Sequence, residues 1–304
     1  MKPILKKPLK VLTVVSATFL SAAMLVMLST IADAQQAASA QKKPTQAEPI
    51  KVPAFRHIDP LAKNPDFKAF PIIRFAVSDD FPPFAYRNQN KVLTGFNILI
   101  ASTVCKVLRV ECRFVVQPFE AAQKSVEEGL ADALITGLRQ TTASEENLSF
   151  TRPYFRFSAR FAVRQAASIK TADVRSLAGK RLGVVGGTYH ARFLKLYFSR
   201  SKLREFDNAS DAFEALRTGA IDALFGDSVK QMFWLKGSAS KNCCRFVGDA
   251  YLDPSSFSQP MSIAVKKGNH KLLDLLNHAL DRLQVSGRYS KIYKQYFPLS
   301  VWKN

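Results

Sequence analysis

Residues 132–154 read DALITGLRQTTASEENLSFTRPY, and this stretch decides the fold prediction. Its apolar run at 133–135 has no polar face, which is typical of a strand covered on both sides. Gly137 ends that strand. Thr142, with Glu145 three residues later, predicts a capping box and hence a short helix. The first N–H groups of such a helix have no partner inside the helix, so they favour an anion beyond the strand end.

The same pattern occurs a second time in the chain. Residues 219–227, GAIDALFGD, repeat residues 129–137, GLADALITG, as a G-x-x-D-A-L strand that leads to a glycine turn. Three strands in total end at a glycine, at Gly137, Gly186 and Gly226. In open α/β sheets, ligands bind beyond the carboxyl ends of the strands. The repeat therefore predicts two similar α/β lobes whose glycine turns converge on a cleft.

Several segments resemble, in order, the extracellular solute-binding proteins of bacterial ABC importers, family 3, the polar amino-acid type. The family's D-A-I-x-x-G-M-x-x-T-x-E-R run and its D-F-S-x-P-Y segment are matched at Gly137, Leu138, Thr141, Phe150, Thr151, Pro153 and Tyr154. The ending GRYSKIYKQYF, residues 287–297, is similar to G-x-Y-x-x-I-Y-x-K-W-F. The resemblance covers residues 70–298. It implies an α/β, two-lobe periplasmic-binding-protein-like fold of type II, with a mixed sheet flanked by helices in each lobe and two crossings at the hinge.

The predicted domain boundaries follow from composition and from this resemblance. A signal peptide is expected at 1–34, and a disordered linker rich in Gln, Ala, Lys and Pro at 35–68. Lobe 1 is expected to comprise residues 69–158 plus 256–304, and lobe 2 residues 159–255.

The amino terminus predicts export. Four lysines precede an apolar run from Val11 to Ile31, which ends in Ala-Asp-Ala at 32–34. A basic region, an apolar region and an A-x-A site are typical of a secretory signal peptide, so we expect cleavage near Ala34 and a periplasmic protein. The run is also close to the length of a membrane-spanning helix, so an anchor is the alternative.

The charge balance is strongly basic. The chain carries 44 basic and 24 acidic residues, a net charge of +20, and removal of residues 1–34 takes away four lysines and one aspartate to leave +17. Because the basic residues are spread along the chain, they do not form the stripe that a nucleic-acid site needs. We expect no nucleic-acid partner, and a basic surface suited to anionic solutes or to the membrane face.

The four cysteines suggest an oxidising compartment. Cys105 and Cys112 lie at a helix end and a strand start, within reach of each other, and several members of the resembled family carry a disulfide across this spacing. We expect that disulfide. Cys243 and Cys244 are adjacent, which leaves a vicinal disulfide, two free thiols or an intermolecular link open. The cysteine spacing and the scattered histidines predict no metal site.

Lobe 1 contains five candidate ligand residues, four at positions that the resemblance marks and one, Arg139, proposed from its place in the loop. Phe81 takes the position of the aromatic that stacks on the ligand, and Phe119 that of the opposite wall, while the alternative for Phe81 is a core position. Gly137 is the glycine of the turn. Ser144 stands where the family has the arginine that pairs with the ligand's α-carboxylate. Arg139 is the candidate replacement for that arginine; its alternative is a solvent-exposed side chain or a surface ion pair.

Lobe 2 supplies three further candidates. The turn before Thr188 and Tyr189 matches the family's second carboxylate-binding turn, where backbone N–H groups face the ligand. Asp227 takes the position of an aspartate that binds the ligand's ammonium group. A simple N-cap of the following helix is the alternative role for Asp227.

The sequence therefore predicts a periplasmic substrate-binding protein that delivers a small zwitterionic or anionic solute, an amino acid or related carboxylate, to the permease of an ABC importer. It is expected to be a monomer without a cofactor. A cyclohexadienyl-dehydratase-like enzyme is one alternative, for which Asp79, Asp80, His190 and Asp227 are the titratable groups near the cleft. A sensor or accessory protein with an altered cleft is another, suggested by Ser144. We expect no enzymatic activity.

Overall fold

The computed structural model describes residues 50, 52, 58 and 70–302, which belong to one compact unit that runs from Ile50 to Asn304. The signal peptide predicted at 1–34 lies outside the described residues, as does the linker at 35–68 apart from three positions. Within the described ranges, no helix combines the length and the apolar character needed to cross a bilayer.

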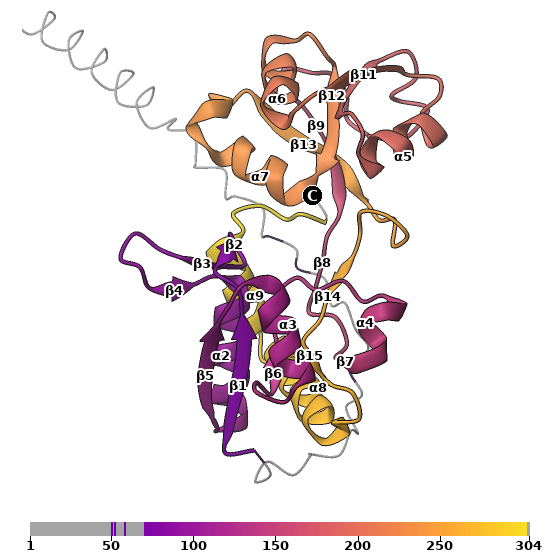
Figure 1. Ribbon diagram of the computed structural model, residues 1–304. Helices are drawn as coiled ribbons and strands as arrows, with labels where there is room; N and C mark the ends of the chain where they lie inside the picture. Colours follow the sequence, from indigo (N-terminus) through magenta and orange to yellow (C-terminus); the bar gives the residue numbers. More distant parts are fainter. Residues whose placement is uncertain (1–49, 51, 53–57, 59–69, 303–304) are drawn as a thin grey trace, which may run out of the picture. The chain divides into compact units, whose positions relative to one another are not determined.

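The first sheet contains strands from both ends of the described chain (Figure 1). Its order is β5 (Glu111–Val116), β1 (Ile72–Val77), β6 (Ala133–Leu134), β15 (Ala264–Lys266) and β7 (Leu148–Phe150). β1 is parallel to both β5 and β6, whereas β15 runs antiparallel to β6 and β7. The carboxyl ends of β5, β1 and β6 therefore lie at one edge of this mixed sheet.

Five helices belong to the first lobe: α2 (Phe96–Leu108), α3 (Phe119–Glu127), α4 (Thr142–Asn147), α8 (His270–Val285) and α9 (Arg288–Tyr296). α2, α8 and α9 pack on one another, and α3 packs against β1. A small sheet made of β2 (Asp80–Phe81), β3 (Ala85–Arg87) and β4 (Leu93–Thr94) follows β1. Phe84, which lies between β2 and β3, is 2% exposed and packs edge-on against Phe96 and Phe155.

The second sheet has the order β11 (Lys202–Phe206), β10 (Arg181–Val185), β12 (Ala223–Asp227), β9 (Ala159–Arg164) and β13 (Cys244–Tyr251). β10 is parallel to β11 and β12, and β9 runs antiparallel to β12 and β13. The helices of this lobe are α5 (Tyr189–Tyr197), α6 (Ala209–Thr218) and α7 (Ser228–Lys236), with the short 3-10 helix η2 (Ser238–Ser240). Its core contains a cluster of aromatic rings around Phe161 and Phe225.

Two passages of chain connect the lobes. The chain leaves the first sheet through β8 (Phe155–Arg156) into β9, and returns from β13 through β14 (Pro260–Met261). β8 and β14 pair antiparallel with each other. The predicted fold, with mixed sheets flanked by helices and two crossings, is confirmed. The first crossing strand, β8, has two residues, and the apolar run that follows it belongs mostly to β9 of the second sheet.

The internal repeat predicted from sequence has a structural basis. In the first lobe, the carboxylate of Asp132 accepts the backbone N–H of Arg74 (2.8 Å) and the Nη2–H of its guanidinium (2.7 Å). In the second lobe, Asp222 accepts the same two groups of Arg181, at 2.8 and 2.6 Å. Each aspartate thus ties the start of one strand to the start of its parallel neighbour, which aligns the strand ends where the site residues lie.

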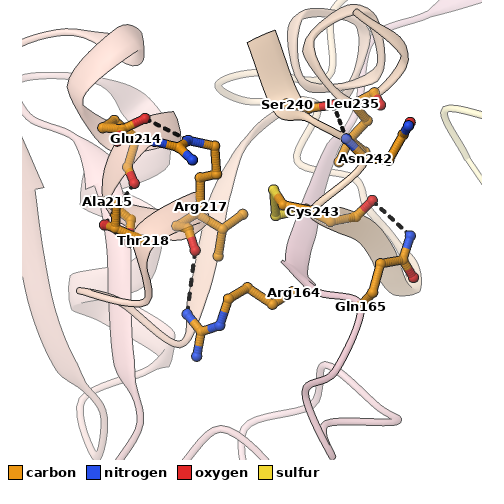
Figure 2. Close-up of a disulfide and its surroundings, with 12 residues drawn as sticks. Arg164, Gln165, Glu214, Ala215, Arg217, Thr218, Leu235, Ser240, Asn242 and Cys243 are labelled. Carbon is orange, nitrogen blue, oxygen red and sulfur yellow. Dashed lines mark hydrogen bonds and ion pairs between the residues drawn. A yellow bond between two sulfur atoms is a disulfide. The ribbon is translucent and has the colours of Figure 1, made fainter. Parts of the chain in front are cut away.

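Both cysteine pairs form disulfides. Cys105 and Cys112 join the end of α2 to β5, with their Cα atoms 5.8 Å apart, which confirms the predicted bridge. Cys243 and Cys244 are joined to each other, so the vicinal disulfide is the alternative that the structure contains. Figure 2 shows Cys243 beside Gln165, whose backbone N–H donates to the Cys243 carbonyl (2.7 Å). This bridge lies where β13 begins, after a turn in which Asn242 has a positive φ of 54°.

Candidate functional site

Four of the five lobe 1 candidates directly follow the carboxyl ends of three neighbouring parallel strands. Phe81 follows β1, Phe119 follows β5, and Gly137 and Arg139 follow β6. Parallel strands end at the same edge of a sheet, so this topology gathers the four residues at one edge. The predicted set is therefore consistent with a single half-site.

Phe81 and Gly137 are in direct contact. A Cβ atom placed on Gly137 would lie 2.8 Å from Cε1 of Phe81, which is closer than carbon atoms approach without strain. The Phe81 ring also stacks on Phe84, with centroids 4.9 Å apart. Phe81 is half-buried, so its ring is packed on one side and keeps some exposed area. The contacts with Phe84 and Gly137 agree with the core interpretation, and the ligand-facing role of Phe81 stays a prediction.

Phe119 is the first residue of α3 and is 36% exposed. No ring contact joins it to Phe81 among the described residues. An aromatic side chain with this exposure at a strand end has apolar area available for a partner. Its predicted role as the second wall of a sandwich stays a prediction.

Ser144 is occupied by the turn that contains it. Its backbone N–H donates to Oγ1 of Thr141 (3.2 Å), and its Oγ accepts from the backbone N–H of Thr141 (2.9 Å). The same Oγ lies 3.0 Å from the carbonyl oxygen of Arg139. This reciprocal pair is a capping box, so the predicted box of Thr142 and Glu145 is wrong by one residue. The helix starts at Thr142, and the residue before it supplies the cap.

Arg139 lies in the loop that this capping box closes. Its side chain is exposed, and its guanidinium has no hydrogen bond or ion pair with any residue that the structure describes. This is the solvent-exposed alternative that the sequence analysis left open. The other alternative, a surface ion pair, is not seen among the described residues, where Glu145 accepts from Nε2 of Gln140, at 2.6 Å. The backbone of Arg139 is held by Ser144 while its charged end is free to bind.

A second half-site lies at the carboxyl ends of β10 and β12. Thr188 is the N-cap of α5: its Oγ1 accepts from the backbone N–H of Ala191 (3.2 Å) and donates to the carbonyl of Val185 (2.7 Å). Gly187 has φ of 69°, a left-handed conformation that favours glycine, and it turns the chain into this cap. The backbone N–H groups at the start of α5 are therefore directed past the end of β10.

A pocket of about 500 Å³ opens at this helix start. Its lining residues are Gly187, Thr188, Tyr189, His190, Arg192 and Phe257. The His190 ring stacks on Phe257 at 4.8 Å, and the Arg192 guanidinium carbon lies 5.4 Å from the centre of the Tyr189 ring. Burial lowers the pKa of His190 to about 4, so its imidazole is neutral at neutral pH. The pocket thus combines aromatic walls, backbone donors and one cation.

Two of these lining residues were missed at the sequence level. Arg192 lies one helical turn after Tyr189, so the helical period was the signal that places it on the same side of α5. Phe257 lies between β13 and β14, in a segment without periodicity, and no sequence pattern indicates that it reaches α5. A histidine-aromatic contact of this kind depends on tertiary structure alone.

Asp227 is the last residue of β12 and the N-cap of α7. Its Oδ1 accepts from the backbone N–H of Lys230, at 2.7 Å. Burial raises the pKa of the Asp227 carboxyl, and the Lys230 N–H opposes that rise only in part. A partly buried carboxylate with a raised pKa gains from a cationic partner such as an ammonium group. Capping and ligand binding are compatible here, because the carboxylate has a second oxygen.

The structure divides the eight predicted ligand residues into distinct groups. Tyr189 and Thr188 line the 500 Å³ pocket, whereas Asp227 lines a separate pocket of about 40 Å³ beside Phe225 and Gln231. β10 and β12 are adjacent parallel strands, so both pockets lie at the same edge of the second sheet. Within the described ranges, no cluster of three or more His, Cys, Asp or Glu side chains is arranged to hold a metal ion.

Comparison with known sequences identifies the family. Residues 73–299 match the bacterial extracellular solute-binding proteins, family 3. The chain belongs to this family, as its sheet order and strand-end site suggest.

Characterised relatives bind amino acids. The chain is 33% identical over 226 residues to ABC transporter arginine-binding protein 1 of Escherichia coli K12. This alignment covers 74% of this chain and 90% of the relative. It is 29% identical over 233 residues to the histidine-binding periplasmic protein of Salmonella typhimurium, covering 76% and 89%.

A solved structure supports the fold assignment. The second substrate-binding domain of a putative amino acid ABC transporter from Streptococcus pneumoniae aligns with a TM-score of 0.63 and 27% identity, covering 74% of this chain and 99% of that domain. The chain therefore has the type II periplasmic-binding-protein fold.

Proposed function

We propose that this protein is the periplasmic receptor of an ABC importer and that it captures a small zwitterionic or anionic solute, an amino acid or related carboxylate. The family membership supports the class of function, and the arginine- and histidine-binding relatives support an amino acid as the solute. The permease of the importer is the proposed partner, and a cleaved signal peptide is the proposed route to the periplasm.

The observation that carries the proposal is the placement of two opposite charges at strand ends. Arg139 follows β6 in the first lobe with an exposed, unpaired guanidinium among the described residues, and Asp227 ends β12 in the second lobe with a carboxylate that burial destabilises. A free guanidinium matches a carboxylate, and a destabilised carboxylate matches an ammonium group. These are the two charged ends of an α-amino acid.

The replacement of the family arginine gives this site its particular character. Ser144 cannot pair with a carboxylate ion as an arginine does, and its hydroxyl is already used inside the capping box. A hydrogen bond to a charged group contributes about 1.5–3 kcal/mol, so a solute carboxylate needs another cation. We propose that Arg139, five residues earlier in the same loop, supplies it.

Ser144 also favours one alternative, a sensor or accessory protein with no solute at all. If no cation replaces the family arginine, the carboxylate site is lost and the fold alone remains. This alternative and the receptor differ in one measurable property, which is solute binding by the purified protein.

We further propose that the protein does not catalyse a reaction. The relatives are binding proteins. His190, a candidate acid or base, has its pKa lowered to about 4 by burial and is a weak proton donor at neutral pH because almost none of it is protonated. Turnover of prephenate or arogenate by the mature protein would show that this part of the proposal is wrong.

The proposal is tested by a thermal-shift screen of amino acids, including arginine and histidine, and of small organic acids, with native mass spectrometry to detect a co-purified solute. We expect at least one solute to raise the melting temperature. Titration calorimetry then gives its affinity. If no compound shifts the melting temperature and no solute co-purifies, the accessory alternative replaces the receptor.

Variants then assign the two charges. Arg139→Ala is expected to weaken binding about 10- to 150-fold, the range that corresponds to loss of one charge-assisted hydrogen bond. Arg288→Ala, which removes an equal charge from an exposed site on α9, is the matched control and should leave affinity unchanged. Equal affinities for all three proteins would refute the role of Arg139.

The role of Asp227 needs a variant that preserves its cap. Asp227→Asn keeps an oxygen that accepts from the Lys230 N–H, since asparagine is an equally good N-cap, but removes the charge. We expect this variant to retain the free energy of unfolding and to lose affinity for a solute with an ammonium group. Retained affinity would leave Asp227 with its capping role only.

A further inference from the structure

The last described residues form a segment that packs into the protein after the final helix. We name residues 298–302 the C-terminal strap. Residues 300–302 lie beyond the region that matches the family, which ends at residue 299. Val301 is nevertheless fully buried, and Trp302 is only 7% exposed. The strap is therefore an integral part of the fold and not a loose extension.

Three successive carbonyl groups of the strap accept hydrogen bonds, two from the second lobe and one from the crossing residue that precedes it. The Ser300 carbonyl accepts from Nη1 of Arg160 (2.9 Å), the Val301 carbonyl from Oγ of Ser158 (2.6 Å), and the Trp302 carbonyl from the backbone N–H of Ala250 (2.9 Å). Arg160 lies in β9 and Ala250 in β13, while Ser158 directly precedes β9. The strap thus runs along the second sheet where β9 begins and β13 ends.

The donor from β9 is unusual in its burial. The Arg160 side chain is 1% exposed, and its guanidinium carbon lies 4.3 Å from the centre of the Phe246 ring. Its Nη2 donates to the carbonyl of Gly248 in β13. A buried guanidinium needs acceptors, because an unsatisfied buried charge is costly. The Ser300 carbonyl is one of those acceptors, so Arg160 depends on the strap.

The other side of the strap is held by the first lobe and by a crossing strand. The Tyr293 hydroxyl in α9 donates to the Leu299 carbonyl (3.0 Å) and accepts from the Val301 N–H (3.1 Å). The Trp302 ring lies 5.1 Å from that of Phe155 in β8, and its Nε1–H donates to the carbonyl of Arg156 (2.7 Å). One short segment therefore contacts α9, β8, β9 and β13.

We propose that the C-terminal strap is a third connection between the lobes and that it restrains their relative rotation. Hinge bending changes the backbone angles of a few residues in the connecting segments. Here the two connecting strands, β8 and β14, have two residues each. When the second lobe rotates, either the strap's hydrogen bonds to β9 and β13 must break, or the strap must move with that lobe and lose its hydrogen bonds to Tyr293 of α9. This restraint does not depend on which solute the protein binds.

The proposal is tested by single-molecule fluorescence energy transfer with one dye on each lobe, at Lys106→Cys and Arg200→Cys, which are exposed positions. The native cysteines are in disulfides and do not compete for the dyes. Deletion of residues 299–304 is expected to raise the rate of interconversion between lobe arrangements at least tenfold. Leu196→Ala, an exposed change on α5 of the second lobe, is the control and should leave the rate unchanged.

Hydrogen exchange shows whether the strap has left its site. The Ala250 N–H loses its acceptor in the truncated chain, so its exchange should accelerate while the amides of β10 and β12 stay protected. An unchanged interconversion rate combined with fast Ala250 exchange overturns the proposal. An increase in the rate under the same conditions supports it.

A milder variant covers the case in which the truncated chain does not fold. Ser158→Ala removes the hydrogen bond to the Val301 carbonyl and also the one that joins the Ser158 and Ser228 hydroxyls (2.7 Å), and it keeps the rest of the strap. Ser228→Ala removes the second of these hydrogen bonds alone and is the matched control. Relative to this control, we expect Ser158→Ala to raise the rate between about 2- and 10-fold, in line with the loss of one hydrogen bond. If Ser158→Ala interconverts at the rate of the unmodified protein, this result alone refutes the proposal that the strap restrains the lobes.

Discussion

The contact between Phe81 and Gly137 gives the most direct test of how the first half-site is built. In Gly137→Ala, the new methyl carbon would start 2.8 Å from Cε1 and 3.3 Å from Cζ of the Phe81 ring. Carbon atoms prefer separations of about 3.5–4.0 Å, so the ring must move by roughly 0.7 Å or more. It cannot move inward, because it stacks on Phe84, which is 2% exposed.

We expect Gly137→Ala to lower the free energy of unfolding by about 1–3 kcal/mol, the usual cost of overpacking. Because Phe81 is half-buried, an outward movement relieves part of the strain, so the lower end of this range is expected. Urea unfolding followed by circular dichroism measures this change. Binding of any solute identified in the screen should weaken as well, since the displaced ring is a proposed wall of the site.

A double-mutant cycle decides whether the cost arises from this contact. Phe81→Leu replaces the ring with a smaller side chain, so Gly137→Ala should cost less in the Phe81→Leu background than in the unmodified protein. Contacting residues typically show coupling energies of about 0.5–3 kcal/mol. If Gly137→Ala costs the same in both backgrounds, the crowding explanation is wrong.

Three further predictions concern the scaffold. Thr141→Ala should lower the free energy of unfolding by about 1 kcal/mol, because it removes the N-cap of α4, whereas Thr142→Ala should change it little. Urea unfolding of the two variants distinguishes the observed capping box from the one expected from sequence. Replacing Cys105 and Cys112 by alanine should cost about 2–3 kcal/mol, given the seven-residue separation, and a smaller loss would indicate that the unfolded chain is already restricted there. The hydrogen bond from Arg181 lowers the pKa of Asp222, so the contribution of this ion pair to stability is complete at neutral pH and is lost as the pH falls through the folded-state pKa. Asp222→Asn should therefore lower the free energy of unfolding at neutral pH and leave it unchanged in strong acid. A difference between the two proteins that does not vary with pH would contradict this explanation.

Much of the fold was predictable because local signals and tertiary structure agree. The G-x-x-D-A-L segments became β6 and β12, and the aspartate in each binds an arginine in the first half of the neighbouring strand. The predicted disulfide needed only two residues at the ends of consecutive elements. These features depend on short stretches of sequence, where spacing carries most of the information.

The features that were not predicted from sequence are of two kinds: alternatives that the local sequence favours about equally, and contacts between distant segments. Thr141 and Thr142 are both good N-caps, and the decision between them was made by the residue three positions later, where Ser144 returns the hydrogen bond. The contact of Phe257 with α5 and the course of the C-terminal strap depend on distant segments. Neither has a periodic pattern that indicates its partner.

The site itself lies between these two cases. Strand-end positions such as those of Thr188 and Asp227 follow from topology, since the turn after a parallel strand lies at a fixed edge of the sheet. Which side chain contacts the solute does not follow, because Thr188 uses its hydroxyl to cap α5, and Ser144 uses its hydroxyl to close the capping box of α4. Polar residues in such turns are needed for helix capping whether or not they also bind a solute.

The capping box at Ser144 also bears on how this protein can evolve. An arginine introduced at that position would remove the hydroxyl that closes the turn and would need space at a site that is now 6% exposed. Such a substitution is therefore expected to destabilise the turn, even if the new guanidinium could bind a carboxylate. The hydroxyl at position 144 is demanded by the backbone hydrogen bonds of its turn, whatever solute the protein binds.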